Sequence, residues 1–157
     1  MRKLLFLLGL GLAVLTPAAA ARADHYDLTV PGKGTIVIFD GKVRVLPLRP
    51  NANTITWTLS RSDGNTTTIS NGSRQLMFDP KTGAVGLVQQ KDTPGRWWKL
   101  TQVDNYKWWR IQATAGKYKG WYLDVQDKPE RKGGPYRLKL SRKPGPRSRI
   151  KIQVVGQ

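Results

Sequence analysis

Short stretches of alternating apolar and polar residues run through the chain from residue 26 onward, and Gly, Pro, Asn and Asp separate them. Alternation with a period of two predicts β-strands that bury one face, and no window shows the spacing of an amphipathic helix. Many short strands divided by turn residues favour a sandwich or a barrel. We predict twelve strands, at 26–30, 35–39, 42–47, 55–60, 66–70, 75–79, 85–89, 97–102, 107–112, 121–125, 136–141 and 149–155.

The predicted strands fall into three similar groups. Each group has an apolar strand that ends in Asp, then a loop, a second strand, a polar or Pro-containing loop and a third strand. The three strand-end residues are Asp40, Asp79 and Asp124, which lie 39 and 45 residues apart. With one further strand before each group, three copies of four strands account for all twelve, so we treat the chain as an internal repeat.

This pattern resembles the β-trefoil, and in particular the ricin B-type lectin domains. The best-matching stretch is 108–125, which has a strand, a small-residue turn and then the Leu-Asp-Val step. The resemblance implies six strands paired in a barrel and three hairpins that cap it. Residues 24–157 are therefore predicted to form one all-β domain of β-trefoil type.

The resemblance also implies sugar pockets in which Asp40, Asp79 and Asp124 accept hydrogen bonds from sugar hydroxyls. The family's pockets carry an aromatic residue one strand later, and a Gln-x-Trp sequence near the end of each repeat. The aromatic position here is occupied by Leu46, Val88 and Lys139, and the Gln is absent from all three repeats. The alternative role for each Asp is to cap the turn at the end of its strand.

Two hairpins have turn sequences specific enough to predict a register. A two-residue turn at 104–105 would place Leu100 opposite Trp109, with both side chains pointing inward. A three-residue Asp-Gly-Asn turn in the preceding hairpin would place Leu59 opposite Ile69.

Residues 1–23 are predicted to be a targeting segment rather than part of the fold. Two basic residues precede an uncharged apolar run at 4–14, and Ala21-Arg22-Ala23 matches the small-residue pattern of a signal cleavage site. The alternative, a membrane anchor, needs about 20 apolar residues, and this run is shorter. We expect cleavage after Ala23 and a secreted or periplasmic product, with no later transmembrane segment.

Charge then indicates the class of partner. The chain has 27 basic and 10 acidic residues. Removal of residues 1–23 takes three basic residues with it and leaves a net charge of +14. Such a surface favours a polyanion, and export makes an acidic or sulfated polysaccharide the more natural partner than nucleic acid. The alternative is a solvated face that keeps the protein soluble.

Strand alternation predicts which side chains point outward and meet such a ligand. The outward cations are Arg137 and Lys139 on one strand, Arg149 and Lys151 on another, and Lys99 and Arg110 on two more. Trp97 and Trp108 also fall on the outward side, beside Lys99 and Arg110, where an indole ring could stack on a sugar. The alternative is that other segments cover these two rings. Trp57, Trp98 and Trp109 fall on the inward side.

The sequence offers little for catalysis. It has no cysteine and one histidine, which excludes disulfides, thiolate sites and a multi-histidine metal centre. No pair of carboxylates stands out by motif. We therefore predict a non-enzymatic carbohydrate-binding module without cofactor or metal. The alternatives are a neutral-sugar lectin that uses the aspartates, and a protein-binding or inhibitory trefoil that uses the Pro-rich loop 142–147.

Overall fold

The computed structural model describes residues 24–47, 55–61, 65–105 and 107–155. Within these ranges all twelve predicted strands are present, and no end differs from its predicted position by more than two residues. The strands are β1 (His25–Val30), β2 (Gly34–Phe39), β3 (Lys42–Leu46), β4 (Trp57–Arg61), β5 (Thr67–Asn71), β6 (Arg74–Phe78), β7 (Val85–Gln89), β8 (Trp98–Val103), β9 (Trp108–Ala113), β10 (Tyr122–Val125), β11 (Leu138–Ser141) and β12 (Lys151–Val154).

Three short 3₁₀ turns join some of these strands: η1 (Pro94–Arg96), η2 (Gly116–Tyr118) and η3 (Pro146–Ser148). No helix among the described residues is long and apolar enough to cross a membrane. The predicted targeting segment, residues 1–23, lies outside the described residues.

Six strands form a closed barrel. β1 pairs with β12 and β4, β4 pairs with β5, β5 with β8, and β8 with β9. The ring is closed by the bridge between Trp109 of β9 and Ile150, just before β12, whose backbone groups exchange two hydrogen bonds of 2.8 Å. Closure joins all six strands into one ring.

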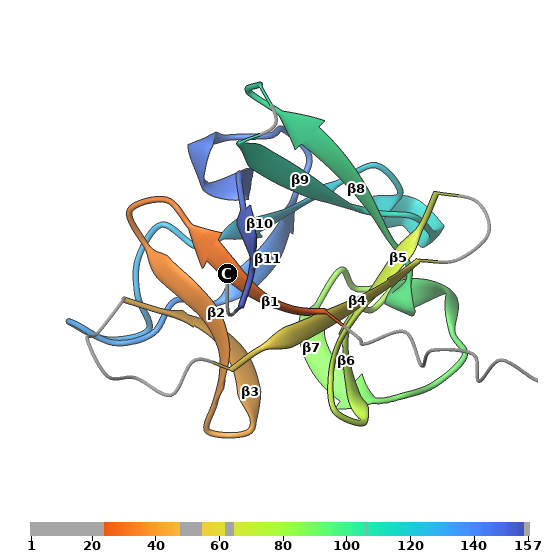
Figure 1. Ribbon diagram of the computed structural model, residues 1–157, viewed down its shortest axis with the longest axis horizontal. Helices are drawn as coiled ribbons and strands as arrows, with labels where there is room; N and C mark the ends of the chain where they lie inside the picture. Colours follow the sequence, from red (N-terminus) through yellow and green to blue (C-terminus); the bar gives the residue numbers. More distant parts are fainter. Residues whose placement is uncertain (1–23, 48–54, 62–64, 106, 156–157) are drawn as a thin grey trace, which may run out of the picture.

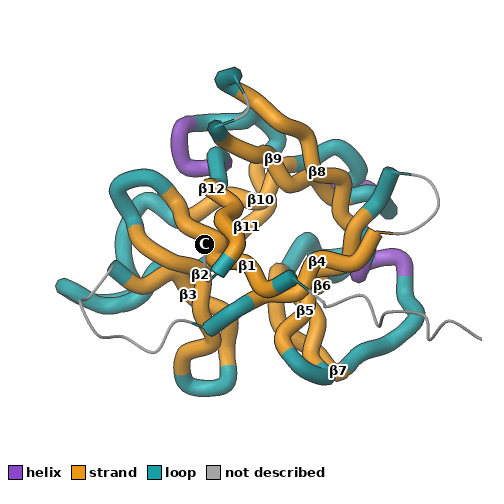
Figure 2. The backbone as a smooth tube through the Cα atoms, in the orientation of Figure 1, coloured by secondary structure: helices purple, strands orange, loops and turns teal. Residues whose placement is uncertain are grey.

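The other six strands form three hairpins that cap one end of the barrel, β2–β3, β6–β7 and β10–β11 (Figures 1 and 2). Each hairpin contacts the other two. The bridge between Val45 and Tyr136 connects β3 directly to the segment before β11. Strands β1–β4, β5–β8 and β9–β12 are therefore three copies of one four-strand unit, which is the β-trefoil arrangement that the repeat predicted.

The core keeps this threefold pattern in two repeats and changes it in the third. Trp57 and Trp98 are fully buried, and each indole Nε1–H donates to a backbone carbonyl of its own cap hairpin. The acceptors are the oxygens of Ile36 and Leu76, each at 2.8 Å. In the third repeat Ile150 takes the inward position. A buried indole needs such a partner because its unpaired N–H would lose a bond to water.

One predicted register is confirmed and one is wrong. Leu59 lies opposite Ile69, as predicted. Leu100, however, lies opposite Ile111 and not Trp109, because four residues rather than two separate β8 from β9. The bridge from Trp109 to Ile150 ties β9 to β12, and the pair Thr67–Trp98 ties β8 to β5, so the observed register is the one that satisfies both tertiary contacts. The shift of two residues leaves every side chain on its predicted face.

Candidate functional site

The outward side of the β8–β9 hairpin brings polar and aromatic groups into cross-strand pairs. Lys99 lies opposite Gln112, Thr101 opposite Arg110, and Val103 opposite Trp108. Their inward neighbours on the two strands include Trp98 and Ile111, both fully buried. Burial of one side of each strand therefore holds the other side in solvent with fixed spacing.

Strand β12 continues this surface on the other side of β9. The antiparallel bridge between Trp109 and Ile150 makes Arg149 the neighbour of Arg110, and Lys151 the neighbour of Trp108. Five of the predicted ligand-binding residues thus lie together, four on three adjacent strands and Arg149 just before β12. We call this surface the β8–β9–β12 face, and it consists of Lys99, Trp108, Arg110, Arg149 and Lys151.

Some cations of this face already contact other protein groups, and others do not. The Arg149 guanidinium forms an ion pair with Asp104 at 2.8 Å. Arg110 lies over the Tyr122 ring, with its guanidinium carbon 5.8 Å from the ring centre. Lys99 and Lys151 are exposed, and in the described part of the chain neither ammonium has a carboxylate at ion-pair distance. These two lysines can therefore meet a ligand anion without first breaking an ion pair.

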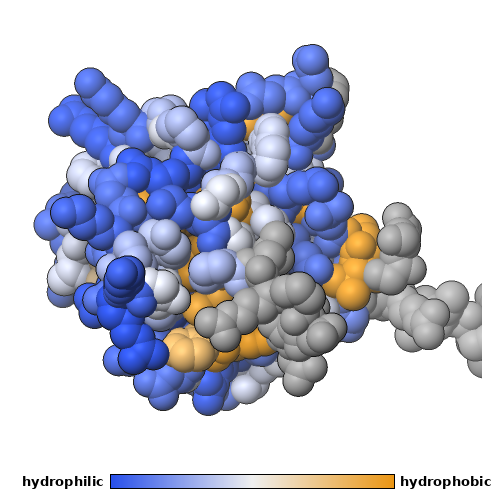
Figure 3. All heavy atoms as spheres, turned by 90° about the vertical axis from the view of Figure 1, so that its left-hand side faces the viewer, coloured by the Kyte–Doolittle hydropathy of each residue, from blue (hydrophilic) through white to orange (hydrophobic). Residues whose placement is uncertain are grey.

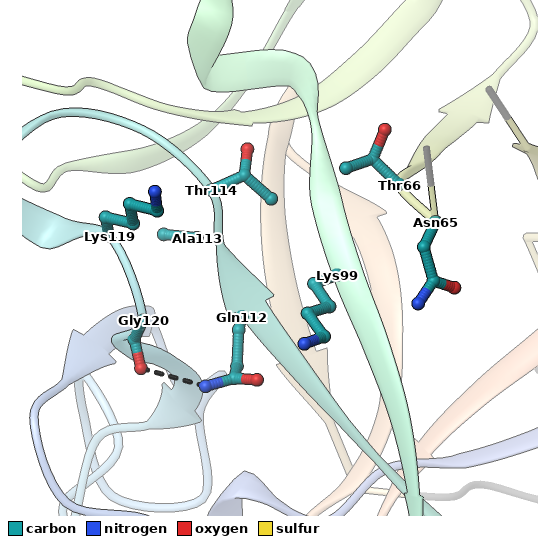
Figure 4. Close-up of a pocket in the computed structure, with 8 residues that line it drawn as sticks. All are labelled: Asn65, Thr66, Lys99, Gln112, Ala113, Thr114, Lys119 and Gly120. Atoms are coloured by element: carbon teal, nitrogen blue, oxygen red, sulfur yellow. Dashed lines mark hydrogen bonds between the residues drawn. The ribbon is translucent and has the colours of Figure 1, made fainter. Parts of the chain in front are cut away.

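A hollow of about 460 Å³ adjoins the face where β8 and β9 approach the start of β5 (Figure 4). Gln112 donates its amide N–H to the Gly120 carbonyl at 3.0 Å, which turns its oxygen toward the side of Lys99. Lys119 supplies a second ammonium group to the same hollow. The lining residues are Asn65, Thr66, Lys99, Gln112, Ala113, Thr114, Lys119 and Gly120.

The chemistry of this hollow suits a small polar anion. Two ammonium groups can pair with a carboxylate or sulfate, and amide and hydroxyl groups can bond to sugar hydroxyls. Its volume lies within the usual range of about 300–1,000 Å³ for small-molecule sites. Gln112 and Lys119 were not predicted as site residues. Strand alternation places Gln112 on the outward side opposite Lys99, and this signal could have identified Gln112 as a site residue. Lys119 and Asn65 come beside these two residues only through the fold.

The remaining predicted cations, Arg137 and Lys139, lie elsewhere. Arg137 precedes β11, and Lys139 is on β11 opposite Asp124 of β10, so both belong to the third cap hairpin. In the described structure β11 pairs with β10 and β12 pairs with β1, so the two predicted basic strands are not neighbours in the sheet. The predicted strip is therefore divided between the cap and the barrel.

Arg137 is also held by an acid. It forms an ion pair with Glu130, and Arg44 reaches the same carboxylate at 3.0 Å. The hydrogen bond from Arg137, and then that from Arg44, lowers the pKa of Glu130. These two arginines thus tie the 127–135 loop to the cap, and this arrangement occupies part of their charge.

The tryptophans divide as alternation predicted, with one difference in depth. Trp97 is half-buried just before β8, and the Arg96 guanidinium carbon lies 4.3 Å from its ring centre. Trp108 is half-buried on the β8–β9–β12 face. Trp109 points inward but is also only half-buried, because it lies at the open end of the barrel. One ring face at Trp97 is therefore already covered by an arginine, whereas no such cation–π contact is found at Trp108 among the described residues.

The three repeat aspartates occupy three different environments. Asp40 is exposed in the β2–β3 turn with a φ of 51°. Asp79 follows β6, and its Oδ1 accepts the backbone N–H of Lys81 at 2.7 Å and of Thr82 at 3.3 Å, bonds that lower its pKa. Asp124 lies inside β10, 5% exposed, and accepts the N–H of Val125 at 2.8 Å.

These aspartates also differ in their position within the repeat. Asp40 lies four residues beyond the carbonyl that accepts the Trp57 bond, and Asp79 lies three residues beyond the carbonyl that accepts the Trp98 bond. Asp79 makes the hydrogen bonds of a turn-capping residue. Among the described residues no cluster of three His, Cys, Asp or Glu side chains could hold a metal ion.

Comparison with known proteins identifies the fold. No family model and no curated protein matches the sequence. The solved structures similar to it include a mosquitocidal holotoxin (TM-score 0.69, 11% identity), covering 84% of this chain and 17% of the toxin. SeviL, solved with asialo-GM1 saccharide, matches at TM-score 0.64 and 14% identity, over 85% of this chain and 98% of SeviL. The designed threefold-symmetric protein ThreeFoil matches at TM-score 0.62 and 13% identity, over 82% and 96%. The chain thus resembles ricin B-like β-trefoil proteins in its fold.

Proposed function

We propose that this protein is exported and binds an anionic polysaccharide, without cleaving it, through the β8–β9–β12 face and the adjoining hollow. The observation that carries the proposal is the alignment of Lys99, Arg110 and Lys151 with Trp108 on three adjacent strands. The similarity to SeviL, which was solved with a saccharide, supports a carbohydrate as the ligand. The predicted signal segment at residues 1–23 supports a location where such polymers occur.

The spacing of the face suits a repeating ligand. Adjacent strands lie about 4.8 Å apart, and alternate residues along a strand lie about 6.6 Å apart. Cations at these distances can each meet a different charged group of one extended chain. Trp108 adds an apolar surface on which a sugar ring can stack. The hollow beside Lys99 then accepts one sugar unit, with Lys119 on its far side.

The rest of the surface is compatible with this arrangement but does not define the site. Figure 3 shows that the side with the β2–β3 hairpin is mostly hydrophilic, with apolar atoms only in small areas among the polar ones. The whole chain carries a formal charge of +17, so a general attraction to polyanions is expected from any side. The test must therefore separate the proposed face from net charge.

A matched pair of variants makes that separation. Lys99→Gln with Lys151→Gln removes two exposed cations from the face, whereas Lys42→Gln with Lys81→Gln removes two exposed cations from the cap hairpins. Both variants have the same net charge. The loss of two charge-assisted contacts, about 1.4 kcal/mol together, weakens binding about tenfold in the first variant and less than twofold in the second.

The measurement is the dissociation constant of the protein for a panel of polymers at low and high salt. The panel contains a uronate polymer, a sulfated polymer, a neutral galactan and duplex DNA, with an assay for new reducing ends. Binding to the anionic glycans that falls with salt and depends on Lys99 and Lys151 supports the proposal. An equal loss in both variants, or equal binding to DNA, would show attraction by net charge alone.

Two further outcomes would replace the proposal. Salt-resistant binding to the neutral galactan that is lost in Asp124→Asn would indicate a neutral-sugar lectin. Release of reducing ends would indicate an enzyme. Binding to none of the polymers would overturn the proposal and direct attention to a protein partner.

A further inference from the structure

The end of the barrel away from the three hairpins contains a second hollow, of about 520 Å³. Strands β1, β4, β5, β8, β9 and β12 all contribute to its lining. Its lining residues are Tyr26, Leu59, Arg61, Asn65, Thr66, Thr67, Lys99, Leu100, Thr101, Gln102, Trp109 and Ile152. All six barrel strands therefore share this hollow, and a site built on strands favours binding because little order is lost when a ligand binds.

The threefold repeat explains why there is space here. Leu59, Leu100 and Ile152 each lie two residues after a buried core residue, which is Trp57, Trp98 or Ile150, and they form an apolar layer below it. A second set lies two residues before the buried Leu28, Ile69 and Ile111. Its members are Tyr26, Thr67 and Trp109. Thr67 is small where the other two repeats carry aromatic rings, so the second repeat leaves part of the barrel end unfilled.

The wall of the barrel also opens at this point. β5 and β8 are joined by a single residue pair, Thr67 with Trp98. Beyond this pair the strands separate, and Lys99, Asn65 and Thr66 line both this hollow and the one on the outer surface. The two hollows therefore adjoin at Lys99, Asn65 and Thr66.

The charge at the rim selects the head group of a ligand. Arg61 and Lys99 both line the hollow, and its lining contains no acidic residue among the described part of the chain. An apolar floor with a cationic rim is complementary to a molecule that has an apolar chain and one anionic end. A neutral chain would satisfy the floor and leave the cations without a partner.

We propose that the open end of the barrel binds an anionic amphiphile, an acyl or aryl chain that ends in a carboxylate or sulfate. The chain lies against Leu59, Leu100 and Ile152, and the anionic group lies at Lys99 and Arg61. This site shares Lys99, Asn65 and Thr66 with the proposed polysaccharide site and is otherwise separate from it, so either proposal can fail without the other.

Decanoate is the probe, with acetate as the anion without a chain and 1-decanol as the chain without a charge. Binding is followed by calorimetry and by the NMR signals of the Trp109 indole and the Leu100 amide. We expect saturable shifts of both signals with decanoate and none with acetate, and 1-decanol to bind at least fivefold more weakly. Equal binding of decanoate and 1-decanol, or no saturable shift, would overturn the proposal.

Three variants locate the site. Thr67→Tyr supplies the ring that the other repeats have, and we expect it to abolish decanoate binding while its circular dichroism spectrum stays that of the parent. Lys99→Gln, at the surface, should weaken decanoate about fivefold and leave 1-decanol unchanged, even if Thr67→Tyr does not fold. The third variant is Lys119→Gln, because Lys119 lines the outer hollow and not the one at the barrel end. It should leave decanoate binding unchanged and reduce binding to the anionic polysaccharide, and the reverse result would contradict the placement.

Discussion

Replacement of Trp98 by Phe tests how the cap is fastened to the barrel. Trp98 is fully buried, its indole N–H donates to the Leu76 carbonyl at 2.8 Å, and its ring meets Phe78 edge-on with ring centres 5.0 Å apart. Trp98→Phe keeps an aromatic ring in the core. It removes the donor and leaves the β6 carbonyl of Leu76 without that bond.

The expected loss of stability has two parts. A buried carbonyl that loses its partner costs about 1–2 kcal/mol. The smaller ring leaves a space of roughly 40 Å³, which costs about 1 kcal/mol at about 24 cal/mol per Å³. We therefore expect Trp98→Phe to lower the free energy of unfolding by about 2–3 kcal/mol. Trp57→Phe should lose a similar amount, because Trp57 makes the equivalent bond to Ile36.

Urea unfolding followed by circular dichroism measures this loss, and an unchanged m-value shows that the same surface is exposed on unfolding. Trp97→Phe is the matched control, since Trp97 is the adjacent residue and is only half-buried. It should lose less than about 1 kcal/mol. Equal losses at Trp97 and Trp98, or a loss below about 1 kcal/mol at Trp98, would refute the assignment of the buried bond.

Three other changes probe charge and backbone. Burial raises the pKa of Asp27, whose Oδ1 has no hydrogen-bond partner in the described structure. Asp27→Asn should therefore stabilise the protein by up to about 1 kcal/mol at neutral pH. Urea titrations should show this gain becoming smaller as the pH falls through the raised pKa. The pKa of Glu130 is lowered by its two arginine partners. Glu130→Gln should therefore destabilise the fold at neutral pH. In thermal melts, the difference in melting temperature between variant and parent should become smaller below the ordinary carboxyl pKa of 4.5. Gly34 has a φ of 123°, and a Cβ there would lie 1.7 Å from the Leu46 carbonyl oxygen. Gly34→Ala should therefore lower the free energy of unfolding, measured with urea, by more than about 3 kcal/mol. Gly32→Ala is the control, with an expected loss of about 1–2 kcal/mol, because φ is 67° there and the space is open.

The wrong register predicted for the β8–β9 hairpin shows that local sequence can identify a turn without determining how the strands pair. Asp104 and Asn105 have φ values of 53° and 52°, as a tight turn requires, yet pairing resumes two residues later than predicted. The turn residues were identified correctly because their backbone preference is local. The observed register satisfies two tertiary contacts at once, that of Trp109 with Ile150, which are 41 positions apart, and that of Thr67 with Trp98.

The candidate site shows the same division. Alternation alone placed Lys99, Trp108 and Arg110 on the outward side, because the opposite side of each strand is apolar and must be buried. It could not show that Arg149 and Lys151 join them while Arg137 and Lys139 do not. That depends on which strands become neighbours, and on Glu130 and Asp104 reaching particular arginines across loops.

The sequence by itself determined the strands, the inward and outward faces and the threefold repeat. These follow from the two-residue period of side chains along a strand and from turn residues that act over a few positions. Tertiary structure alone decided the register of β9, the depth of Asp124 and the assembly of the two hollows. Those features arise from contacts between repeats. The hollow at the barrel end in particular is lined by Thr67 together with Tyr26 and Trp109, which come from three different repeats.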